Sequence, residues 1–247
     1  MLPLTGAGQF VAKNGIVIDV PQGQWPLLPV LCRLAQIGAR TRIANGEKQV
    51  SLDGLRLDSP LLLRGEDIFY RETFVDDVYR IRDMDLSGRT VVDVGASVGD
   101  TGLAFAMKGA RVYAFEPSRM LYPFLERNAA QNRLAGTVLT FNLGFSNRSH
   151  REEVAGDTLE LVDGVAYTLE HLPQRVFCLK MDCEGCEYHL LGDQRFLDHL
   201  DPQVITMEYH HGAEALVSCL EGRGYRVESV ATKPAEGYLY ATRDAVH

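Results

Sequence analysis

A glycine-rich run bounded by two acids occupies the middle of the chain, and it reads Val91-Val92-Asp93-Val94-Gly95-Ala96-Ser97-Val98-Gly99-Asp100. A β-branched segment leads into this run and a helical pattern follows it, so the glycines stand where the backbone turns sharply and a ligand can approach. Asp93 and Asp100 would repel a pyrophosphate and attract a cation. The run therefore predicts a nucleoside-like ligand that carries positive charge.

The glycine spacing separates two kinds of ligand. A dinucleotide fingerprint has G-x-G-x-x-G, which leaves helix amides free for a pyrophosphate, whereas this run has G-x-x-x-G. S-adenosylmethionine, with its ammonium and sulfonium groups, matches the acids better. We expect the cofactor to be bound by Asp93, Gly95, Ala96, Ser97, Gly99 and Asp100. An NAD-linked oxidoreductase and a non-catalytic nucleoside-binding scaffold are the alternatives.

Three further cofactor residues are predicted after the next two strands. Glu116 follows the second predicted strand, in Tyr113-Ala114-Phe115-Glu116-Pro117. It lies close to the offset of about 20 residues after the first strand at which an acid hydrogen-bonds ribose hydroxyls. We expect Glu116 to hold the ribose, with Pro117 beside it. Asn142 follows the third strand and could hydrogen-bond the adenine edge, although a turn role suits Asn142-Leu143-Gly144 nearly as well.

A second acidic cluster follows the fourth predicted strand, in Leu179-Lys180-Met181-Asp182-Cys183-Glu184-Gly185-Cys186-Glu187. Open α/β sheets bind ligands at the carboxyl edge where this turn lies. Its carboxylates could hold the acceptor, accept its proton, or bind a divalent metal through oxygen. We expect Asp182 and Glu184 to face the acceptor, with Asp182 also near the cofactor, and we assign no metal site.

The cysteines predict a reducing compartment. Cys183 and Cys186 match C-x-x-C, but a structural zinc site would need a second pair or nearby histidines, so we interpret them as small side chains beside the acidic turn. The five cysteines are odd in number, which argues against a disulfide framework. We therefore expect a cytoplasmic protein.

Two histidines follow the fifth predicted strand, in Met207-Glu208-Tyr209-His210-His211-Gly212. Histidine titrates near neutral pH, so His210 or His211 could accept a proton from a hydroxyl acceptor, with Glu208 orienting one of them. Because side chains alternate in direction, we expect only one to face the ligands. Surface or helix-capping histidines are the alternative.

With Thr168-Leu169-Glu170 before the acidic turn, the glycine-rich run and that turn together resemble the FkbM family of S-adenosylmethionine-dependent methyltransferases, from about Tyr79 to Glu208. The resemblance implies a class I methyltransferase that methylates a hydroxyl of a sugar, polyketide or other secondary metabolite. The family usually has Thr-Leu-Asp where this chain has Thr168-Leu169-Glu170. The first 60 residues carry none of the resemblance, so it does not identify the acceptor.

The elements that must position these residues follow from hydrophobic periodicity. After Leu86, β-branched runs alternate with helical patterns, which predicts a Rossmann-like, doubly wound α/β sheet. The predicted strands are Thr90 to Val94, Arg111 to Phe115, Thr137 to Phe141, Val176 to Met181, Val204 to Glu208, Arg226 to Val230, and Tyr238 to Thr242. The last two are joined too closely for a helix, so they should pair antiparallel.

Residues 1–87 are predicted to form an accessory segment or lid, and residues 88–247 the cofactor-binding domain. Within the first segment, apolar residues at helical spacing predict a helix from Trp25 to Ile37, and Asp53-Gly54 between alternating residues predicts a hairpin. Shortly before the first strand lie Tyr70, Arg71, Glu72 and Tyr79, where we expect a segment that folds over the cofactor.

Composition narrows the partners. The 247-residue chain is 46% hydrophobic with a formal net charge of −8, enough for a substantial core and without the clustered basic residues that bind nucleic acid. No stretch reaches the roughly 18 apolar residues that cross a bilayer, so we expect no membrane partner. We therefore expect the partner to be a small hydroxylated acceptor molecule, and a homo-oligomer is compatible with the composition.

Overall fold

The computed structural model describes residues 8–11, 17–20, 28–61 and 70–244. At its centre is a seven-stranded sheet in the order β14-β15-β13-β12-β6-β7-β8. Its strands are β6 (Thr90–Val94), β7 (Arg111–Phe115), β8 (Thr137–Phe141), β12 (Cys178–Met181), β13 (Val204–Tyr209), β14 (Arg226–Ala231) and β15 (Gly237–Thr242). β15 runs antiparallel to β13 and β14, and the other neighbours are parallel. The predicted doubly wound sheet is confirmed.

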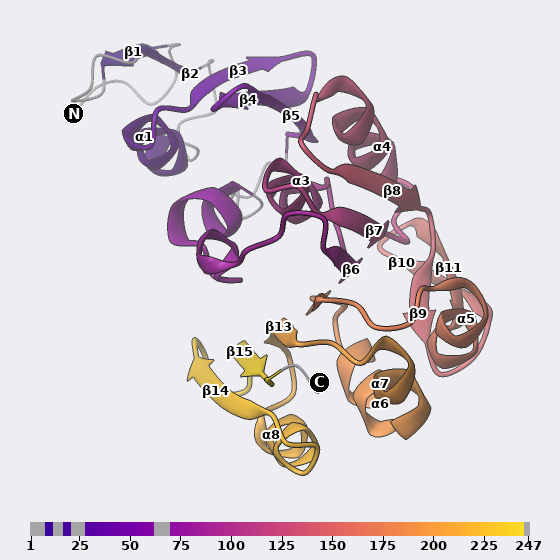
Figure 1. Cartoon of the computed structure of the whole chain (residues 1–247). Helices are drawn as coiled ribbons and strands as arrows, with labels where there is room; N and C mark the ends of the chain where they lie inside the picture. The colour runs from indigo at the N-terminus through magenta and orange to yellow at the C-terminus, as the bar shows by residue number, and fades with distance from the viewer. Residues whose placement is uncertain (1–7, 12–16, 21–27, 62–69, 245–247) are drawn as a thin grey trace.

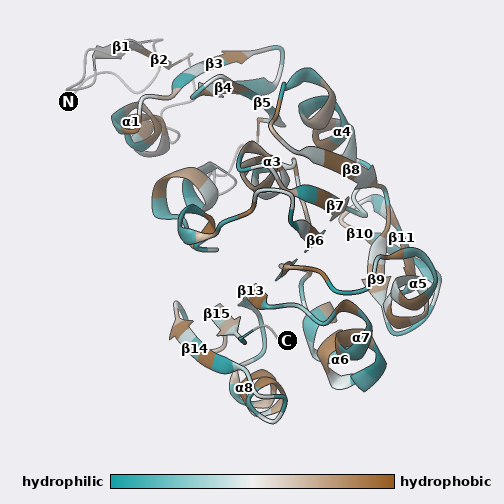
Figure 2. Cartoon of the chain, in the orientation of Figure 1, coloured by the Kyte–Doolittle hydropathy of each residue, from teal (hydrophilic) through white to brown (hydrophobic). Residues whose placement is uncertain are grey.

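Helices cover both faces of this sheet, as parallel strands require. Val91 and Val92 in β6 point to opposite faces and both are fully buried, Val91 in a cluster with Phe105 and Val92 in a cluster with Phe196. The first face carries α3 (Asp100–Met107) and α4 (Tyr122–Gln131), and the second carries α5 (Gly164–His171), α6 (Cys186–Gly192), α7 (Gln194–Leu200) and α8 (Glu214–Glu221) (Figure 1). Figure 2 shows hydrophobic and hydrophilic residues together on α4, α5 and α7, as expected for helices with one buried side.

The N-terminal segment packs against the first face. It contains β1 (Gly8–Val11), β2 (Val17–Val20), α1 (Leu28–Gln36), β3 (Arg40–Ala44), β4 (Glu47–Leu52) and β5 (Leu55–Pro60). The hairpin predicted around Asp53-Gly54 joins β4 to β5, and both turn residues have positive φ, at 48° and 84°. The predicted helix begins at Leu28, and Trp25 lies outside the described residues.

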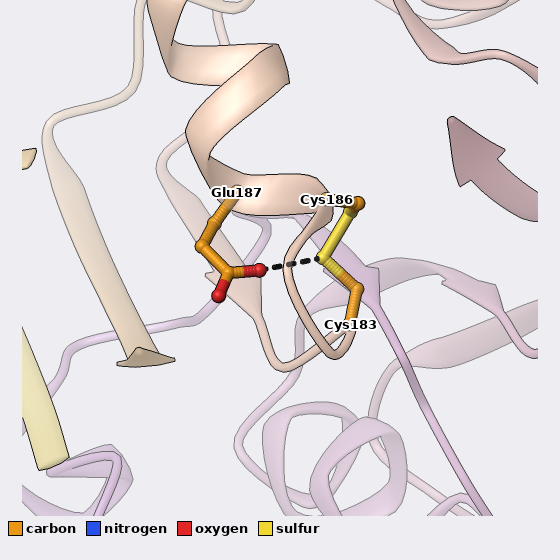
Figure 3. A group of neighbouring side chains, drawn as sticks. All are labelled: Cys183, Cys186 and Glu187. Carbon is orange, nitrogen blue, oxygen red and sulfur yellow. Dashed lines mark hydrogen bonds between the residues drawn. A yellow bond between two sulfur atoms is a disulfide. The ribbon is translucent and has the colours of Figure 1, made fainter. Parts of the chain in front are cut away.

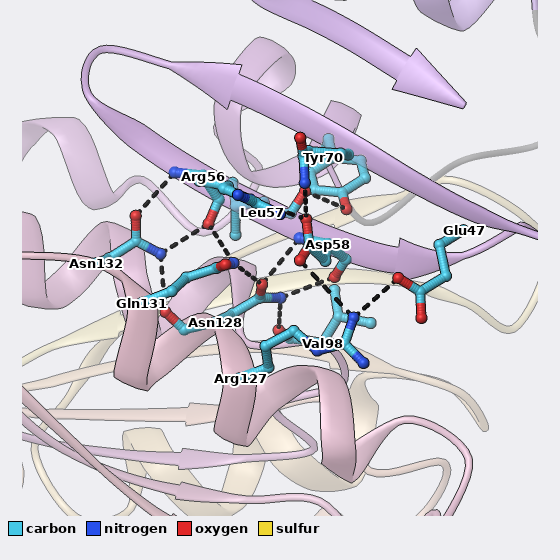
Figure 4. Close-up of polar contacts among 11 residues, drawn as sticks. Glu47, Arg56, Leu57, Asp58, Tyr70, Val98, Arg127, Asn128, Gln131 and Asn132 are labelled. Carbon is cyan, nitrogen blue, oxygen red and sulfur yellow. Dashed lines mark hydrogen bonds and ion pairs between the residues drawn. The ribbon is translucent and has the colours of Figure 1, made fainter. Parts of the chain in front are cut away.

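A buried amide links this segment to the sheet domain. The side chain of Asn128 in α4 accepts a hydrogen bond from the Asp58 N–H and donates to the carbonyl oxygens of Asp58 and Val98, each at 2.8 Å (Figure 4). Nearby, Leu103 of α3 is buried in one cluster with Leu57 of β5. The hairpin is therefore held by polar and apolar contacts, and the boundary after residue 87 stays a prediction.

A small sheet not predicted from the sequence follows β8. It consists of β9 (Gly144–Ser146), β10 (His150–Val154) and β11 (Asp157–Asp163), in the order β10-β11-β9. β10 contains mostly charged and exposed residues, so it lacks the apolar alternation by which strands are recognised. The one sequence feature that marks this sheet is Gly156. Ala155 and Gly156 form the turn between β10 and β11, with positive φ values of 51° and 85°.

The segment before β6 reaches the carboxyl edge of the sheet. A π-helical segment (Arg71–Asp76) and a 3₁₀ turn (Ile81–Asp83) flank Tyr79, whose ring contacts Tyr238 edge-on. The Tyr238 hydroxyl donates to Glu72 at 3.1 Å. Among the described residues, no helix is long and apolar enough to cross a membrane.

Candidate active site

A cavity of about 1080 Å³ lies at the carboxyl edge of the sheet. Its volume slightly exceeds the roughly 300–1,000 Å³ typical of small-molecule sites, which leaves room for two ligands. Its lining includes Glu72, Tyr79, Gly95, Ala96, Ser97, Asp100, Glu116, Pro117, Lys180, Asp182 and Glu184. The topology thus brings the glycine-rich run and the acidic turn to one site.

The glycine loop between β6 and α3 depends on close backbone packing. Gly95 has φ 80°, and a Cβ placed there would lie 1.7 Å from the carbonyl oxygen of Asp182. The N–H groups of Gly95 and Ala96 both donate to the carbonyl of Phe115, at 3.0 and 2.9 Å. The loop is therefore fixed against the ends of β7 and β12, with Ala96 and Ser97 on the cavity wall.

Glu116 joins two loops of the cavity. Its carboxylate accepts hydrogen bonds from the N–H groups of Ser97 and Ser118, both at 2.8 Å. Burial raises the pKa of Glu116 to about 7 despite these hydrogen bonds. Each carboxylate oxygen has a second lone pair, so Glu116 can still accept hydrogen bonds from a ligand's hydroxyls.

Asp93 lies beneath the loop and does not line the cavity. Its fully buried carboxylate is 3.1 Å from Nζ of Lys180 and accepts a hydrogen bond from Thr101 at 2.6 Å. Lys180 also donates to the carbonyl of Gly95 at 2.6 Å. Burial opposes the charge on Lys180, but Asp93 and Asp182 outweigh it and raise its pKa. The structure thus places Asp93 as a support of the loop, which differs from the direct cofactor contact we expected.

Lys180 was missed as a site residue, although the sequence contained a signal. It is a charge inside the otherwise apolar strand Cys178–Met181, where a lysine needs a partner. Asp93 is the matching charge inside β6, and the two are paired in register.

Of the predicted cofactor residues Asp100 and Asn142, only Asp100 lines the cavity. Asp100 lines the cavity, its side chain accepts a hydrogen bond from the Thr73 hydroxyl, and burial raises its pKa to about 7. Asn142 does not line the cavity, and its amide donates to the carbonyls of Glu116 and Pro117 at 2.8 and 3.2 Å. Asn142 therefore holds the segment after β7, which is neither the adenine contact nor the Asn142-Leu143-Gly144 turn considered from the sequence.

The acidic turn lines the cavity next to the glycine loop. Asp182 lies on the cavity wall and accepts a hydrogen bond from the buried Tyr79 hydroxyl at 2.8 Å. Glu184 also lines the cavity, with 85% of its side chain exposed. Glu187 points inward, is fully buried and accepts the Gly185 N–H at 3.0 Å. Tyr79, from the segment predicted to fold over the cofactor, therefore contacts the acidic turn and lines the cavity.

Cys183 and Cys186 form a disulfide at the start of α6 (Figure 3). This corrects the interpretation of the pair as unlinked small side chains, because the C-x-x-C turn brings the two sulfur atoms together. Glu187 Oε2 is 3.3 Å from the sulfur of Cys183, a distance at which a reduced thiol would donate to the carboxylate. The cytoplasmic location stays a prediction.

Neither His210 nor His211, the two histidines predicted as proton acceptors, lines the cavity. His210 lies among carboxylates, with Nδ1 3.2 Å from Glu187 and Nε2 3.6 Å from Glu184 and 3.8 Å from Asp182. The Glu187 hydrogen bond and the neighbouring charges raise the pKa of His210 to about 9. His210 is therefore protonated at neutral pH, which differs from the predicted proton acceptor, and Glu187 rather than Glu208 orients it.

His211 lies outside the cavity, on the exposed side of the acidic turn. Its N–H donates to the Tyr188 hydroxyl at 2.8 Å, and its ring is close to Gly185. Its role as a base therefore has no geometric support in this conformation. Glu208 lies close to Asp182 and His210. Burial and the neighbouring charges of Asp182 and Glu72 raise the pKa of the Glu208 carboxyl to about 7.

Fold and site together define a class I methyltransferase, an enzyme that takes its methyl group from S-adenosylmethionine. A methyltransferase FkbM domain matches residues 93–227, more than half of the chain. The chain belongs to the FkbM methyltransferase family. This membership decides against the NAD-linked and non-catalytic alternatives.

Individual relatives have different acceptors. A stretch of 72 residues is 39% identical to 31-O-demethyl-FK506 methyltransferase FkbM of Streptomyces tacrolimicus, and it spans 28% of either chain. Over 198 residues the chain is 24% identical to protein N-lysine methyltransferase METTL21A of Danio rerio, covering 76% of this chain and 88% of that one. The crystal structure of M. jannaschii TYW2 with AdoMet matches at a TM-score of 0.51 and 15% identity, covering 81% of this chain and 87% of that one. The last similarity shows the fold.

Proposed function

We propose that this enzyme transfers the methyl group of S-adenosylmethionine to a hydroxyl of a small molecule. The observation that carries the proposal is one cavity lined both by the predicted cofactor residues Gly95, Asp100 and Glu116 and by Asp182 of the acidic turn. The short match to the FK506 methyltransferase supports an oxygen acceptor. The acidic chain, with its net charge of −8, argues against a nucleic-acid acceptor.

The cavity suits an acceptor with apolar surface. Leu159 and Leu161 line it, together with Met120 and Val154, which are 55% and 44% exposed. Exposed large hydrophobic side chains beside a ligand site favour contact with an apolar partner. We therefore expect a hydroxylated acceptor with a hydrocarbon framework rather than a small, fully polar sugar.

The residues of the chain would mainly align the two ligands. When bound, S-adenosylmethionine supplies an electrophilic methyl group on its sulfonium, and transfer requires in-line approach of the acceptor oxygen. We place the ribose at Glu116 and the cationic end near Asp100 and Asp182. Asp182, held by Tyr79, then faces the acceptor hydroxyl and hydrogen-bonds its proton.

A lysine amine is a second candidate acceptor. The similarity to METTL21A favours it, and the carboxylates of Asp182 and Glu184 would attract an ammonium group. A discriminating experiment incubates the enzyme with radiolabelled S-adenosylmethionine and, separately, hydroxylated macrolides and lysine-containing peptides. Label in the macrolides supports the first proposal, and label in the peptides alone would overturn it.

Asp182→Asn tests the placement of the acceptor. We expect it to lower kcat by about 10²–10⁴-fold, the range for loss of a proton-transfer group, with S-adenosylhomocysteine binding retained within about threefold. Asp198→Asn is the control, because Asp198 lies on α7 with 68% of its side chain exposed. Equal kcat in the two variants would contradict the assignment.

A further inference from the structure

We propose that Asp182, Glu208 and His210 form a binding site for a divalent cation where the acidic turn meets the cavity. One carboxylate oxygen from each acid and one imidazole nitrogen all lie within 4.8 Å of one another. Cation binding is independent of the acceptor, whereas the catalytic use of the cation rests on the proposed function.

The sheet brings the three ligands together. β12 and β13 are parallel neighbours, and Met181 is paired in register with Met207. Asp182 and Glu208 are the next residues along the chain after this pair, so they lie side by side at the end of the sheet. His210 follows two residues after Glu208, and its Nε2 is 3.8 Å from Asp182. The convergence therefore arises from strand pairing.

Two buried groups outside the set orient its members. Glu187, with a fully buried side chain, lies 3.2 Å from Nδ1 of His210 and so holds that nitrogen as an N–H. Nε2 then faces Asp182, and a cation that binds there would displace the proton from Nε2, because a ligating imidazole is neutral. Tyr79, 2% exposed, donates to Oδ2 of Asp182 at 2.8 Å. A metal-binding histidine commonly has a carboxylate on its other nitrogen, and ligating carboxylates are commonly hydrogen-bonded in turn.

The type of ligand selects the type of cation. Two carboxylates and one imidazole, with no thiolate available while Cys183 and Cys186 are joined, suit Mn²⁺ or Mg²⁺ better than a soft metal. The negative charge around the three ligands also favours a divalent cation. Glu72, Glu184 and Glu187 add three further carboxylates, whereas Lys180 is engaged by Asp93. A divalent cation would offset this excess of negative charge.

A cation here would serve the reaction as the proposed function requires. Asp182 belongs to both the cation set and the cavity wall, so a hydroxyl in the cavity could reach the ion. A bound cation lowers the pKa of a coordinated hydroxyl and orients it.

Mn²⁺ binding tests the site without any acceptor or methyl donor. Chelator-treated, desalted enzyme is titrated with Mn²⁺ alone, and free Mn²⁺ is followed by electron paramagnetic resonance. We expect one saturable site, weakened by at least about 10–100-fold in Glu208→Gln or His210→Gln, because loss of a direct ligand should cost no less than loss of an outer-shell partner. Glu221→Gln, which removes an exposed carboxylate on α8, should bind like the parent enzyme.

S-adenosylhomocysteine binding by each variant shows that it is folded. A parent enzyme without a saturable Mn²⁺ site, or folded variants that bind Mn²⁺ as the parent does, would overturn the proposal. Saturable Mn²⁺ binding in an enzyme that methylates only peptides would sustain the cation site and refute the hydroxyl acceptor. The two proposals therefore fail separately.

Discussion

Gly95 shows how a single hydrogen atom in place of a side chain can determine the shape of a loop on the cavity wall. A Cβ there would collide with the carbonyl of Asp182, and the positive φ disfavours any other residue. We expect Gly95→Ala to weaken S-adenosylhomocysteine binding at least tenfold and to lower the free energy of unfolding by about 2 kcal/mol. Titration calorimetry and urea unfolding measure the two effects.

Gly192→Ala is the matched control for Gly95→Ala. Gly192 ends α6 without a positive φ, and a Cβ placed on it would have no atom within 4 Å, so alanine should be tolerated. If the two variants bind S-adenosylhomocysteine equally, the close approach of the glycine loop to Asp182 has no functional weight.

Glu116 predicts a pH dependence of stability. The pKa of its carboxyl is near 4.5 when unfolded and near 7 in the fold, so the folded state binds more protons between these values. Stability from this group therefore falls as pH rises from about 4.5 to 7. Glu116→Gln should reduce the loss of urea midpoint between pH 5.5 and 7.5, without abolishing it, because Asp100 is shifted in the same direction.

Glu126→Gln provides the comparison for Glu116→Gln. Glu126 is exposed on α4, so its substitution should leave the pH dependence of the parent enzyme. A Glu116→Gln variant with that same dependence would show that Glu116 ionises alike in both states.

At this scale the sequence predicted which residues reach the site better than which way they point. Gly95, Ser97, Asp100, Glu116 and Asp182 line one cavity because strand order alone places the ends of their strands together. The direction of a side chain depends on its partners. Asp93 does not line the cavity and is instead paired with Lys180, which belongs to a strand far along the chain, and hydrophobic periodicity carries no information on that pairing.

Among the elements, α6 begins with a feature that can be tested chemically. The Cys183–Cys186 disulfide closes a loop of only four residues, so its loss should cost at most about 2 kcal/mol of unfolding free energy. We expect the Cys183→Ala/Cys186→Ala enzyme to fold and to unfold at slightly lower urea concentration. Mass spectrometry after alkylation of the unreduced parent should find these two cysteines unmodified.

Cys32→Ala removes a cysteine that is free in the structure and should leave the disulfide intact. Alkylation of Cys183 and Cys186 in unreduced, denatured parent enzyme would contradict the assignment of the bond.

The strands of the main sheet were predictable and the small sheet was not, for one physical reason. Buried parallel strands such as Thr90–Val94 need apolar residues throughout, and that pattern is visible in the sequence. β10 is exposed along nearly all its length and is held by backbone pairing with β11, so its side chains are free to be charged. Elements that contribute little to a core leave little trace in hydrophobic periodicity.

For the whole molecule, Asn128 provides a buried polar link between the N-terminal hairpin and the sheet domain. Asn128→Ala leaves the N–H of Asp58 and two carbonyls without their buried partner, which should lower the free energy of unfolding by about 3 kcal/mol. Asn132→Ala removes a similar amide whose bonds to Arg56 are exposed, so it should cost less than about 1 kcal/mol. Urea unfolding compares them, and equal losses would mean that the buried link carries no special weight.

The same amide has a consequence for how ligand binding is felt at a distance. Asn128 contacts the carbonyl of Val98 inside the glycine loop and the backbone of Asp58 in β5. A cofactor that orders the loop must also restrain the hairpin strand on the other side of α4. Deuterium should therefore replace the amide hydrogen of Asp58 more slowly when the cavity is filled, which makes a strand remote from the chemistry a gauge of its occupancy.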